Sequence, residues 1–267
     1  MNEHRYPGLG GFRLGLSLAV ALNHLTGILR TTFARFSARA QQKRAAILRS
    51  RIGLHPRAKI IDLGGNDGGQ IARLFPEWKN VTICDLSEAA LAKARARGFD
   101  TIQADATGGV PVPDNHFDFC FCSSVIEHVT GPKAEMRSMT DGHAFKQEAI
   151  ANQLAFAAEI RRIARSYFVQ TPHPLFPIES HTWLPGVILL LPRARLLALV
   201  RFTNRFWPKK ASPDWHLLTA KDMARLFPDA EIVIERFCGL PKSIIAVKEP
   251  APPDRPFVPK RQAETVA

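Results

Sequence analysis

Acidic residues are missing from the beginning of this 267-residue chain, where none lies between Glu3 and Asp62. The same stretch contains eleven arginines and lysines, whereas the remainder is close to neutral and the whole chain carries a formal net charge of +12. A basic arm without acids indicates an anionic neighbour, such as a lipid surface, a nucleic acid or a phosphorylated substrate. The alternative is a solvated basic helix that has no partner.

Cysteine is scarce as well, and no spacing typical of a disulfide framework or a zinc site occurs. Each of the four lies in a segment that predicts a buried strand: Cys84, Cys120, Cys122 and Cys238. Cys120 and Cys122 alternate with two phenylalanines, which predicts that both thiols face one side of a strand. We expect free thiols that pack as small apolar side chains, in a reducing compartment.

The sequence also lacks an apolar run long enough to cross a bilayer. The longest candidate, residues 14–29, is interrupted by Asn23, His24 and Thr26. Residues 19–21 look like a signal-peptide cleavage site, but the interruptions favour an amphipathic helix that lies on a membrane or on the domain itself. We therefore expect a cytoplasmic protein whose basic N-terminal arm contacts an anionic membrane surface.

Short apolar segments alternate with helical ones from residue 59 onward. Strands are predicted at residues 59–63, 81–84, 101–104, 117–123 and 167–170. The helices between them are predicted at residues 69–75, 88–97 and 143–164. This alternation indicates an α/β fold with a mostly parallel sheet, in which ligands bind at the carboxyl ends of the strands.

The two ends of the chain depart from this rhythm. Residues 1–50 predict a basic, amphipathic helical extension, which includes a helix at about 31–51, and residues 249–267 predict a disordered, proline-rich tail. Between them, residues 51–248 form one domain with an insertion at about 172–216, rich in proline, histidine and tryptophan. A helix from Thr219 and strands at 231–236 and 243–247 then predict an antiparallel hairpin at the sheet edge.

A glycine-rich turn follows the first predicted strand and reads Asp62-Leu-Gly64-Gly65-Asn66-Asp67-Gly68. Such a turn lets the backbone approach a ligand closely and aims helix amides at it. A dinucleotide site would require Gly-x-Gly-x-x-Gly, and here Asn66 occupies the middle position. The carboxylates of Asp62 and Asp67 would repel a pyrophosphate, but they suit the amino and sulfonium groups of S-adenosylmethionine (SAM).

Two further acids follow the next two predicted strands. Asp85 is placed to accept hydrogen bonds from both ribose hydroxyls, and Asp105 to accept one from an adenine amine. Each acid alone could be a helix cap or a turn residue. Three acids at successive strand ends, behind one glycine turn, favour a ligand that contains adenosine.

At this point a resemblance becomes evident. The glycine turn resembles motif I of class I SAM-dependent methyltransferases, and Ser123-Ser124-Val125-Ile126-Glu127-His128 resembles their small-molecule branch, which includes quinone-biosynthesis O-methyltransferases. The similarity covers residues 51–247, apart from the insertion. It implies a Rossmann-like class I fold, with a mostly parallel seven-stranded sheet and an antiparallel edge hairpin, and SAM as cofactor. The departure is Asn66 in place of the second glycine, although asparagine adopts positive φ more readily than other non-glycine residues.

The resemblance also implies a set of cofactor-binding residues. The turn would hold the methionine moiety, the next strand end the ribose and adenine, and the end of the fourth strand would face the methyl group. The implied set is Asp62, Gly64, Gly65, Asn66, Gly68, Asp85, Leu86, Asp105, Ala106 and Ser123.

Three hypotheses compete for Glu127 and His128. In the first, these residues simply open a helix; in the second, His128 or His181 serves as a general base. Some relatives place Glu-x-x-Glu-His here to hold a divalent cation, and His173 or His181 of the insertion could supply a missing ligand. Because Ser124 replaces the first glutamate, we expect no metal, and the catalytic candidates are His128, Glu127 and His181. The insertion from Gln170 onward also resembles bacterial methyltransferases in which this region shapes the acceptor pocket.

Methyl transfer from a sulfonium mainly requires alignment of the acceptor and exclusion of water, because the donor is already activated. The sequence lacks the Asn/Asp-Pro-Pro-aromatic motif of enzymes that methylate base amino groups. The oily insertion and the basic arm favour O-methylation of a small-molecule, lipid or lipid-linked glycan acceptor. The alternatives are an RNA methyltransferase that holds phosphates with the basic arm, which makes nucleic acid a less favoured partner, and a non-catalytic SAM-fold module.

Overall fold

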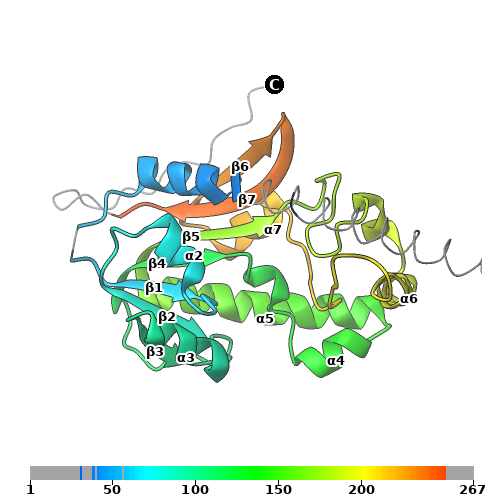
Figure 1. Ribbon diagram of the computed structural model, residues 1–267, viewed down its shortest axis with the longest axis horizontal. Helices are drawn as coiled ribbons and strands as arrows, with labels where there is room; N and C mark the ends of the chain where they lie inside the picture. The colour runs from blue at the N-terminus through cyan, green and yellow to red at the C-terminus, as the bar shows by residue number, and fades with distance from the viewer. Residues whose placement is uncertain (1–30, 32–37, 40, 56, 251–267) are drawn as a thin grey trace, which may run out of the picture.

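The computed structural model describes residues 31, 38–39, 41–55 and 57–250. Within these residues seven strands form one sheet in the order β3-β2-β1-β4-β5-β7-β6 (Figure 1). The strands are β1 (Ile60–Leu63), β2 (Val81–Asp85), β3 (Asp100–Gln103), β4 (Phe117–Ser123), β5 (Ala164–Pro172), β6 (Glu231–Phe237) and β7 (Leu240–Lys248). Strands β1 to β5 pair in parallel, whereas β7 pairs antiparallel with both β5 and β6.

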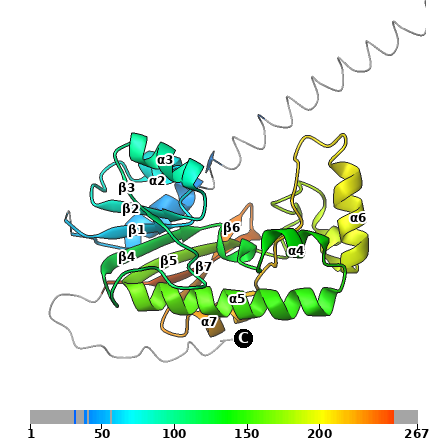
Figure 2. The same cartoon turned by 90° about the horizontal axis from the view of Figure 1, so that it is seen from below.

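Helices cover both faces of the sheet (Figure 2). They are α2 (Gly69–Leu74), α3 (Glu88–Ala96), α4 (Lys133–Ser138), α5 (Gly142–Ile163), α6 (Arg193–Thr203) and α7 (Ala220–Leu226), with the short 3₁₀ helices η1 (Ile126–His128) and η2 (Gly186–Leu190). A further helical segment at residues 41–51 precedes the sheet. No helix among the described residues is both long and apolar enough to cross a membrane.

Two hydrophobic clusters occupy the two faces of the sheet. Residues of the helical segment 41–51 pack with α2 and α3 against one face, where Phe119 and Phe121 contribute from β4. On the other face α5 and α7 pack against Cys120 and Cys122. The alternation of phenylalanine and cysteine along β4 therefore fills both layers, as the sequence pattern predicts, because successive side chains of a strand point to opposite faces.

The local signals of the sequence mark the helix ends correctly. The Ser87 side chain accepts a hydrogen bond from the amide of Ala90 at the start of α3. Thr219 caps α7 in a reciprocal arrangement with Asp222, and such caps satisfy amides that have no partner within the helix. One cysteine prediction is wrong: Cys238 is exposed, with φ 49°, because it lies between β6 and β7 where the hairpin turns.

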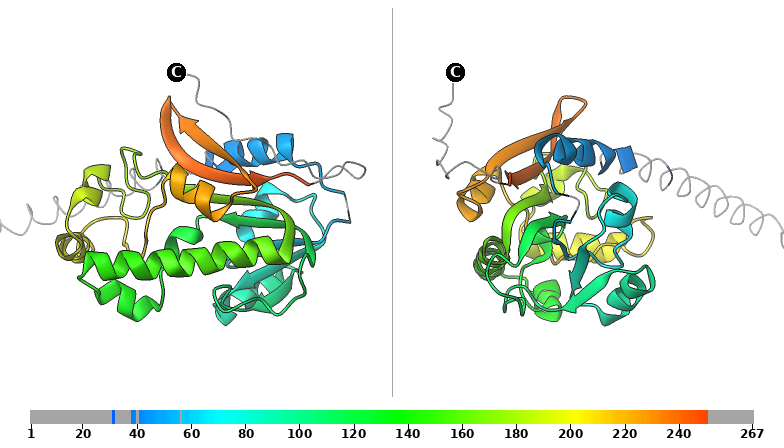
Figure 3. Two further views of the ribbon diagram at one scale, coloured as in Figure 1. Left: turned by 180° about the vertical axis from the view of Figure 1, so that it is seen from behind. Right: turned by 90° about the vertical axis from the view of Figure 1, so that its left-hand side faces the viewer.

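The segment between β5 and α7 corresponds to the predicted insertion. It contains η2 and α6, and Figures 2 and 3 show α6 at one end of the molecule, beside α4 and one end of α5. Most of the predicted N-terminal extension, including residues 14–29, and most of the predicted tail lie outside the described residues, so those boundaries stay predictions.

Candidate functional site

The glycine turn joins β1 to α2 through three residues with positive φ: Gly64 at 75°, Asn66 at 54° and Gly68 at 70°. A Cβ atom on Gly64 would lie 2.5 Å from a methyl group of Val125, and one on Gly68 would lie 2.7 Å from the Phe99 ring. Glycine is thus required at both positions by conformation and by space. Asn66 adopts the left-handed conformation with its side chain in place.

Asp85 anchors this turn from the end of the neighbouring strand. Its Oδ2 accepts a hydrogen bond from the backbone amide of Asn66 at 2.9 Å, and its Oδ1 accepts one from the amide of Ser87, also at 2.9 Å. Each carboxylate oxygen has two lone pairs. One hydrogen bond to each oxygen therefore leaves acceptor capacity for ligand hydroxyls.

Asp62 lies beneath the turn, at the end of β1, with 3% of its surface exposed. Burial and, to a smaller extent, the negative charge of Asp85 together raise the pKa of its carboxyl group to about 7. A Cβ atom on Gly65 would lie 2.6 Å from the Asp62 carboxyl group, so the turn packs directly on this acid. Asp67, in contrast, accepts hydrogen bonds from the Gly69 amide and from Arg97, which directs it toward the end of α3.

The remaining residues predicted for adenosine lie beyond β2 and β3. Leu86 is 59% exposed, which is unusual for a large apolar side chain and offers a surface on which a flat base can pack. Asp105 Oδ1 accepts hydrogen bonds from the amide and hydroxyl of Thr107. Ala106 is buried in the core, so its methyl group packs inward.

Ser123 ends β4 and joins three elements. Its hydroxyl donates to Gln170 Oε1 of β5 at 2.8 Å and accepts from Gln70 Nε2 of α2 at 3.3 Å. Ser124, with φ 59°, donates from its own hydroxyl to the same Gln170 oxygen at 3.1 Å. Gln170 is fully buried, and its Nε2 has no hydrogen-bond partner among the described residues.

The three catalytic candidates of the sequence lie together. Glu127, His128 and His181 each present a ligand-type atom, and these atoms all lie within 4.8 Å of one another. The two imidazole rings meet edge to face at 4.7 Å, and the His181 ring stacks on Trp215 at 4.8 Å. The insertion therefore delivers His181 to the end of β4, although the two histidines are far apart in the sequence.

Each histidine is held by a buried carboxylate. His181 Nδ1 lies 2.6 Å from Glu179 Oε1, and His128 Nδ1 lies 3.2 Å from Asp214 Oδ1. Burial would lower the pKa of His181, but the carboxylates of Glu127 and Glu179 raise it to about 9. Burial would likewise raise the pKa of Asp214, but His128, Lys133 and Arg137 lower it to about 2.

Hydrogen bonds from α5 position η1, which carries Glu127 and His128. The buried Gln153 side chain donates to the backbone carbonyl of Ile126 at 3.0 Å and to that of His216 at 3.0 Å. The amide of His216 in turn donates to the carbonyl of Glu127 at 2.8 Å. Helix α5 and the end of the insertion thereby fix the position of η1.

Several members of this arrangement cannot be predicted from the sequence. Nothing in the local pattern singles out Asp214, which supports His128 from the far end of the insertion, or Trp215, which stacks on His181. Glu179 lies in the motif that resembles an acceptor pocket, but its role as the partner of His181 depends on the fold. For Gln170, only its place at a strand end was a signal.

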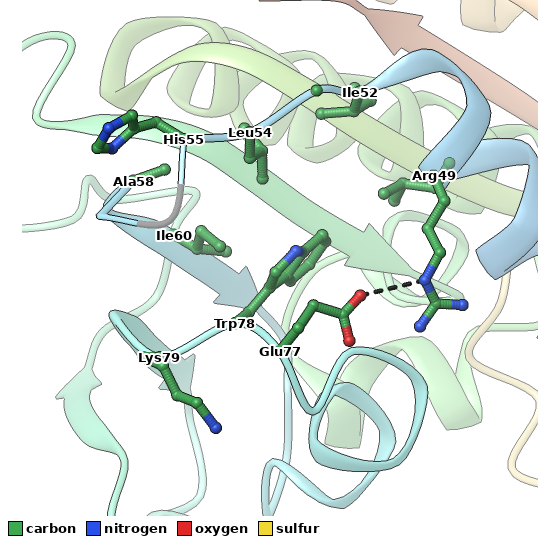
Figure 4. Close-up of a pocket in the computed structure, with 11 residues that line it drawn as sticks. Arg49, Ile52, Leu54, His55, Ala58, Ile60, Glu77, Trp78 and Lys79 are labelled. Carbon is green, nitrogen blue, oxygen red and sulfur yellow. Dashed lines mark hydrogen bonds and ion pairs between the residues drawn. The ribbon is translucent and has the colours of Figure 1, made fainter.

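A hollow near the amino end of β1 is a separate feature (Figure 4). It lies beside the beginning of β1, with Ile60, Trp78 and the ion pair of Arg49 and Glu77 among its lining residues. None of the predicted cofactor residues lines it. The site at the carboxyl ends of the strands therefore remains the candidate, since parallel α/β sheets bind ligands there.

The strand order, with its antiparallel edge hairpin, is that of class I methyltransferases. Residues 61–141, which contain the glycine turn, Asp85, Asp105 and η1, match the family model described as a methyltransferase domain. The sheet topology and this match together support a class I SAM-dependent methyltransferase domain around residues 61–141, and SAM is the cofactor of that class.

Similar proteins of known name include the ubiquinone/menaquinone biosynthesis C-methyltransferase UbiE of Shewanella sp. (strain ANA-3). It is 34% identical over 98 residues, which cover 33% of this chain and 39% of the relative. The UbiE protein of Shewanella oneidensis is 33% identical with the same coverage. The chain thus spans well under half the length of these curated relatives.

Solved structures with a similar arrangement include a SAM-dependent methyltransferase from Aquifex aeolicus. It has a TM-score of 0.42 at 14% identity and covers 73% of this chain and 83% of its own.

Proposed function

We propose that the protein is a SAM-dependent methyltransferase that O-methylates a small-molecule, lipid or lipid-linked glycan acceptor. The observation that carries this proposal is the turn at the end of β1, held open by three positive φ angles and tied to Asp85. It lies where the strand order reverses, between β1 and β4, which is the ligand-binding crevice of open α/β sheets.

The residues around this turn suit SAM chemically. The Asp85 carboxylate can accept from ribose hydroxyls, and the exposed Leu86 side chain gives the adenine an apolar neighbour. When bound, SAM supplies a methyl group on a positively charged sulfur. The chain's own task is to align the acceptor with that methyl group and to exclude water.

The acceptor side of the crevice is proposed to be the cluster of Glu127, His128 and His181. Glu127 and His128 follow Ser123 by only a few residues, and Val125 between them packs against Gly64 of the turn. A hydroxyl acceptor must lose its proton during transfer. Nitrogen and carboxylate acceptors gathered beside the donor turn can assist that loss.

Exposed apolar side chains support an acceptor that partitions into lipid. Of the nine large hydrophobic residues exposed in the described part of the chain, five lie in the insertion: Leu175, Val187, Leu190, Phe202 and Phe206. The names of the matched relatives refer to quinone biosynthesis, which supports a hydroxylated, membrane-soluble ring as acceptor. These relatives are named C-methyltransferases, whereas we propose transfer to an oxygen atom. The identity of the attacked atom therefore needs a test of its own.

Calorimetric titration of the purified protein with SAM, S-adenosylhomocysteine and NAD tests the donor site. We expect micromolar binding of both adenosyl ligands and no binding of NAD. A folded protein that binds neither adenosyl ligand would overturn the proposal in favour of the non-catalytic module. Transfer of an isotopically labelled methyl group to hydroxylated quinones and glycolipids, followed by product analysis, then distinguishes O- from C-methylation.

A further inference from the structure

The cluster formed by Glu127, His128 and His181 contains one buried oxygen without a partner. Glu127 is fully buried; its Oε2 accepts a hydrogen bond from the Thr171 hydroxyl at 3.1 Å, whereas its Oε1 has no hydrogen-bond partner among the described residues. His181 Nε2 lies 3.9 Å from this oxygen, which is too far for a hydrogen bond. Leaving such a charged atom unpaired in the interior is costly.

The two histidines are oriented in the same way. In each ring Nδ1 faces a buried carboxylate, Glu179 for His181 and Asp214 for His128, so Nε2 is the nitrogen left to bind something else. Histidines that bind metal ions almost always donate their second ring N–H to a carboxylate or carbonyl group, which fixes the tautomer and strengthens the ligand. This cluster has two such pairs side by side.

The surroundings are mixed in charge. Asp214 is offset by Lys133 and Arg137, each 3.5 Å from its Oδ2. Glu127 and Glu179 carry the remaining negative charge, with Arg44 as a further cationic neighbour of Glu127. One carboxylate and two imidazoles offer three ligand atoms to a dication, and the Trp215 ring stacked on His181 limits how far that ligand can move.

We propose that Glu127, His128 and His181 bind a divalent first-row transition-metal ion through one carboxylate oxygen and two Nε2 atoms. Two histidines and one carboxylate are a ligand set that suits such ions and leaves coordination positions open. An open position near Ser123 would bind the acceptor hydroxyl and lower its pKa. That use of the ion rests on the proposed function, whereas binding of the ion does not.

The sequence alone favours the opposite expectation, because Ser124 occupies the place of a possible glutamate ligand. The structure changes this by bringing His181 from the insertion, and by supplying Glu179 and Asp214 as supporting carboxylates.

The test is calorimetric titration of chelator-treated, untagged protein with Zn²⁺, Mn²⁺ and Mg²⁺. We expect one equivalent of Zn²⁺ or Mn²⁺ to bind, with Mg²⁺ much weaker because imidazole is a poor ligand for it. His181→Asn and Glu127→Gln should each weaken binding by more than about 100-fold, and Glu179→Gln by roughly 10- to 100-fold. His173→Asn, in the same insertion but outside the cluster, is the matched control.

Circular dichroism and S-adenosylhomocysteine binding report whether each variant keeps its fold and donor site. If His181→Asn does not fold, the metal affinities of the isosteric Glu127→Gln and Glu179→Gln variants are compared with those of the wild type and His173→Asn instead. No saturable uptake of Zn²⁺ or Mn²⁺ by folded wild-type protein would overturn the proposal. So would a loss in His173→Asn equal to that in His181→Asn. Metal binding without S-adenosylhomocysteine binding would support this site while rejecting the methyltransferase proposal.

Discussion

The backbone amide of Asn66 donates a 2.9 Å hydrogen bond to Asp85 Oδ2. The two residues follow adjacent strands, so this bond joins the turn after β1 to the acid after β2. Asn66 occupies the place where the family motif has glycine, yet it adopts φ 54° and keeps its amide directed at the acid. The substitution therefore preserves the shape of the turn.

Replacing Asp85 with alanine should weaken S-adenosylhomocysteine binding by roughly 10- to 100-fold, because hydrogen bonds to a charged group contribute about 1.5–3 kcal/mol. Isothermal titration calorimetry measures the change. Asp100→Ala, at the exposed beginning of β3, is the control and should bind normally. Unchanged affinity in Asp85→Ala would remove the ribose assignment.

Asn66 should tolerate glycine but not valine. Asn66→Gly is expected to bind S-adenosylhomocysteine at least as well as the wild type, because glycine adopts positive φ freely. Asn66→Val should lose about 1–2 kcal/mol of stability and also lose affinity, since left-handed backbone is strained for other L-residues. Asn115 has the same φ of 54° outside the site, so Asn115→Val should lower the thermal midpoint yet leave binding intact. Equal binding by Asn66→Val and the wild type would contradict this prediction.

Gly64→Ala should disturb the donor site through Val125. The added Cβ would meet the valine methyl groups at 2.5 and 2.6 Å, and such overpacking costs about 1–3 kcal/mol. Adding Val125→Ala should restore part of the lost stability and binding, as urea unfolding and calorimetry would show. Gly239→Ala, with φ 78° and open space around it, isolates the cost of backbone strain. Identical losses in Gly64→Ala and Gly239→Ala would argue against the contact.

The buried Asp62 should make stability depend on pH. Its pKa in the folded state is raised from 3.8 to about 7, so the folded protein retains a proton that the unfolded chain releases. Its contribution is therefore complete below about pH 4 and is lost as the pH rises through 7. By linkage the loss reaches at most about 4 kcal/mol. Urea unfolding between pH 5 and 8 should show a flatter profile for Asp62→Asn than for the wild type, and parallel profiles would refute the assignment.

The basic arm should bind anionic vesicles at low salt. Each arginine near such a surface contributes roughly 1 kcal/mol. Replacing Arg5, Arg13, Arg30 and Arg35 with glutamine should thus weaken co-sedimentation with phosphatidylserine vesicles strongly and leave S-adenosylhomocysteine binding unchanged. Neutral vesicles and high salt serve as controls, because screening removes the attraction. A wild-type protein that ignores anionic vesicles would end the membrane hypothesis.

Much of the sheet follows from short-range patterns. Apolar segments that end in an acid or a glycine turn mark β1 to β3, and a long apolar run marks β4. Ser87 and Thr219 mark the starts of helices through local hydrogen bonds. These elements can be predicted from the sequence because the interacting residues are close together in the chain. The same reasoning fails at Cys238, because the chain turns one residue beyond the end of β6 at Phe237.

The proposed acceptor side is harder to predict from the sequence, because its residues come into contact from distant parts of the chain. Glu127 and His128 attract attention through a family motif, but their association with His181 depends on how the insertion folds back over β4 and β5. Asp214 and Trp215 have no local signal at all. Likewise, the short helix α4, missed in the sequence, begins after Pro132 without a capping side chain.

The origin of His181 and Asp214 in the insertion separates the protein into two functional modules. The proposed donor crevice is built from the first four strands, whereas one member of the proposed acceptor cluster, His181, and the supporting Asp214 arrive with one contiguous segment. Exchange of that segment between related chains would alter acceptor choice and acceptor activation in a single event, while the residues proposed to bind the cofactor stay unchanged. Diversification of chemistry on this scaffold can therefore proceed by loop replacement.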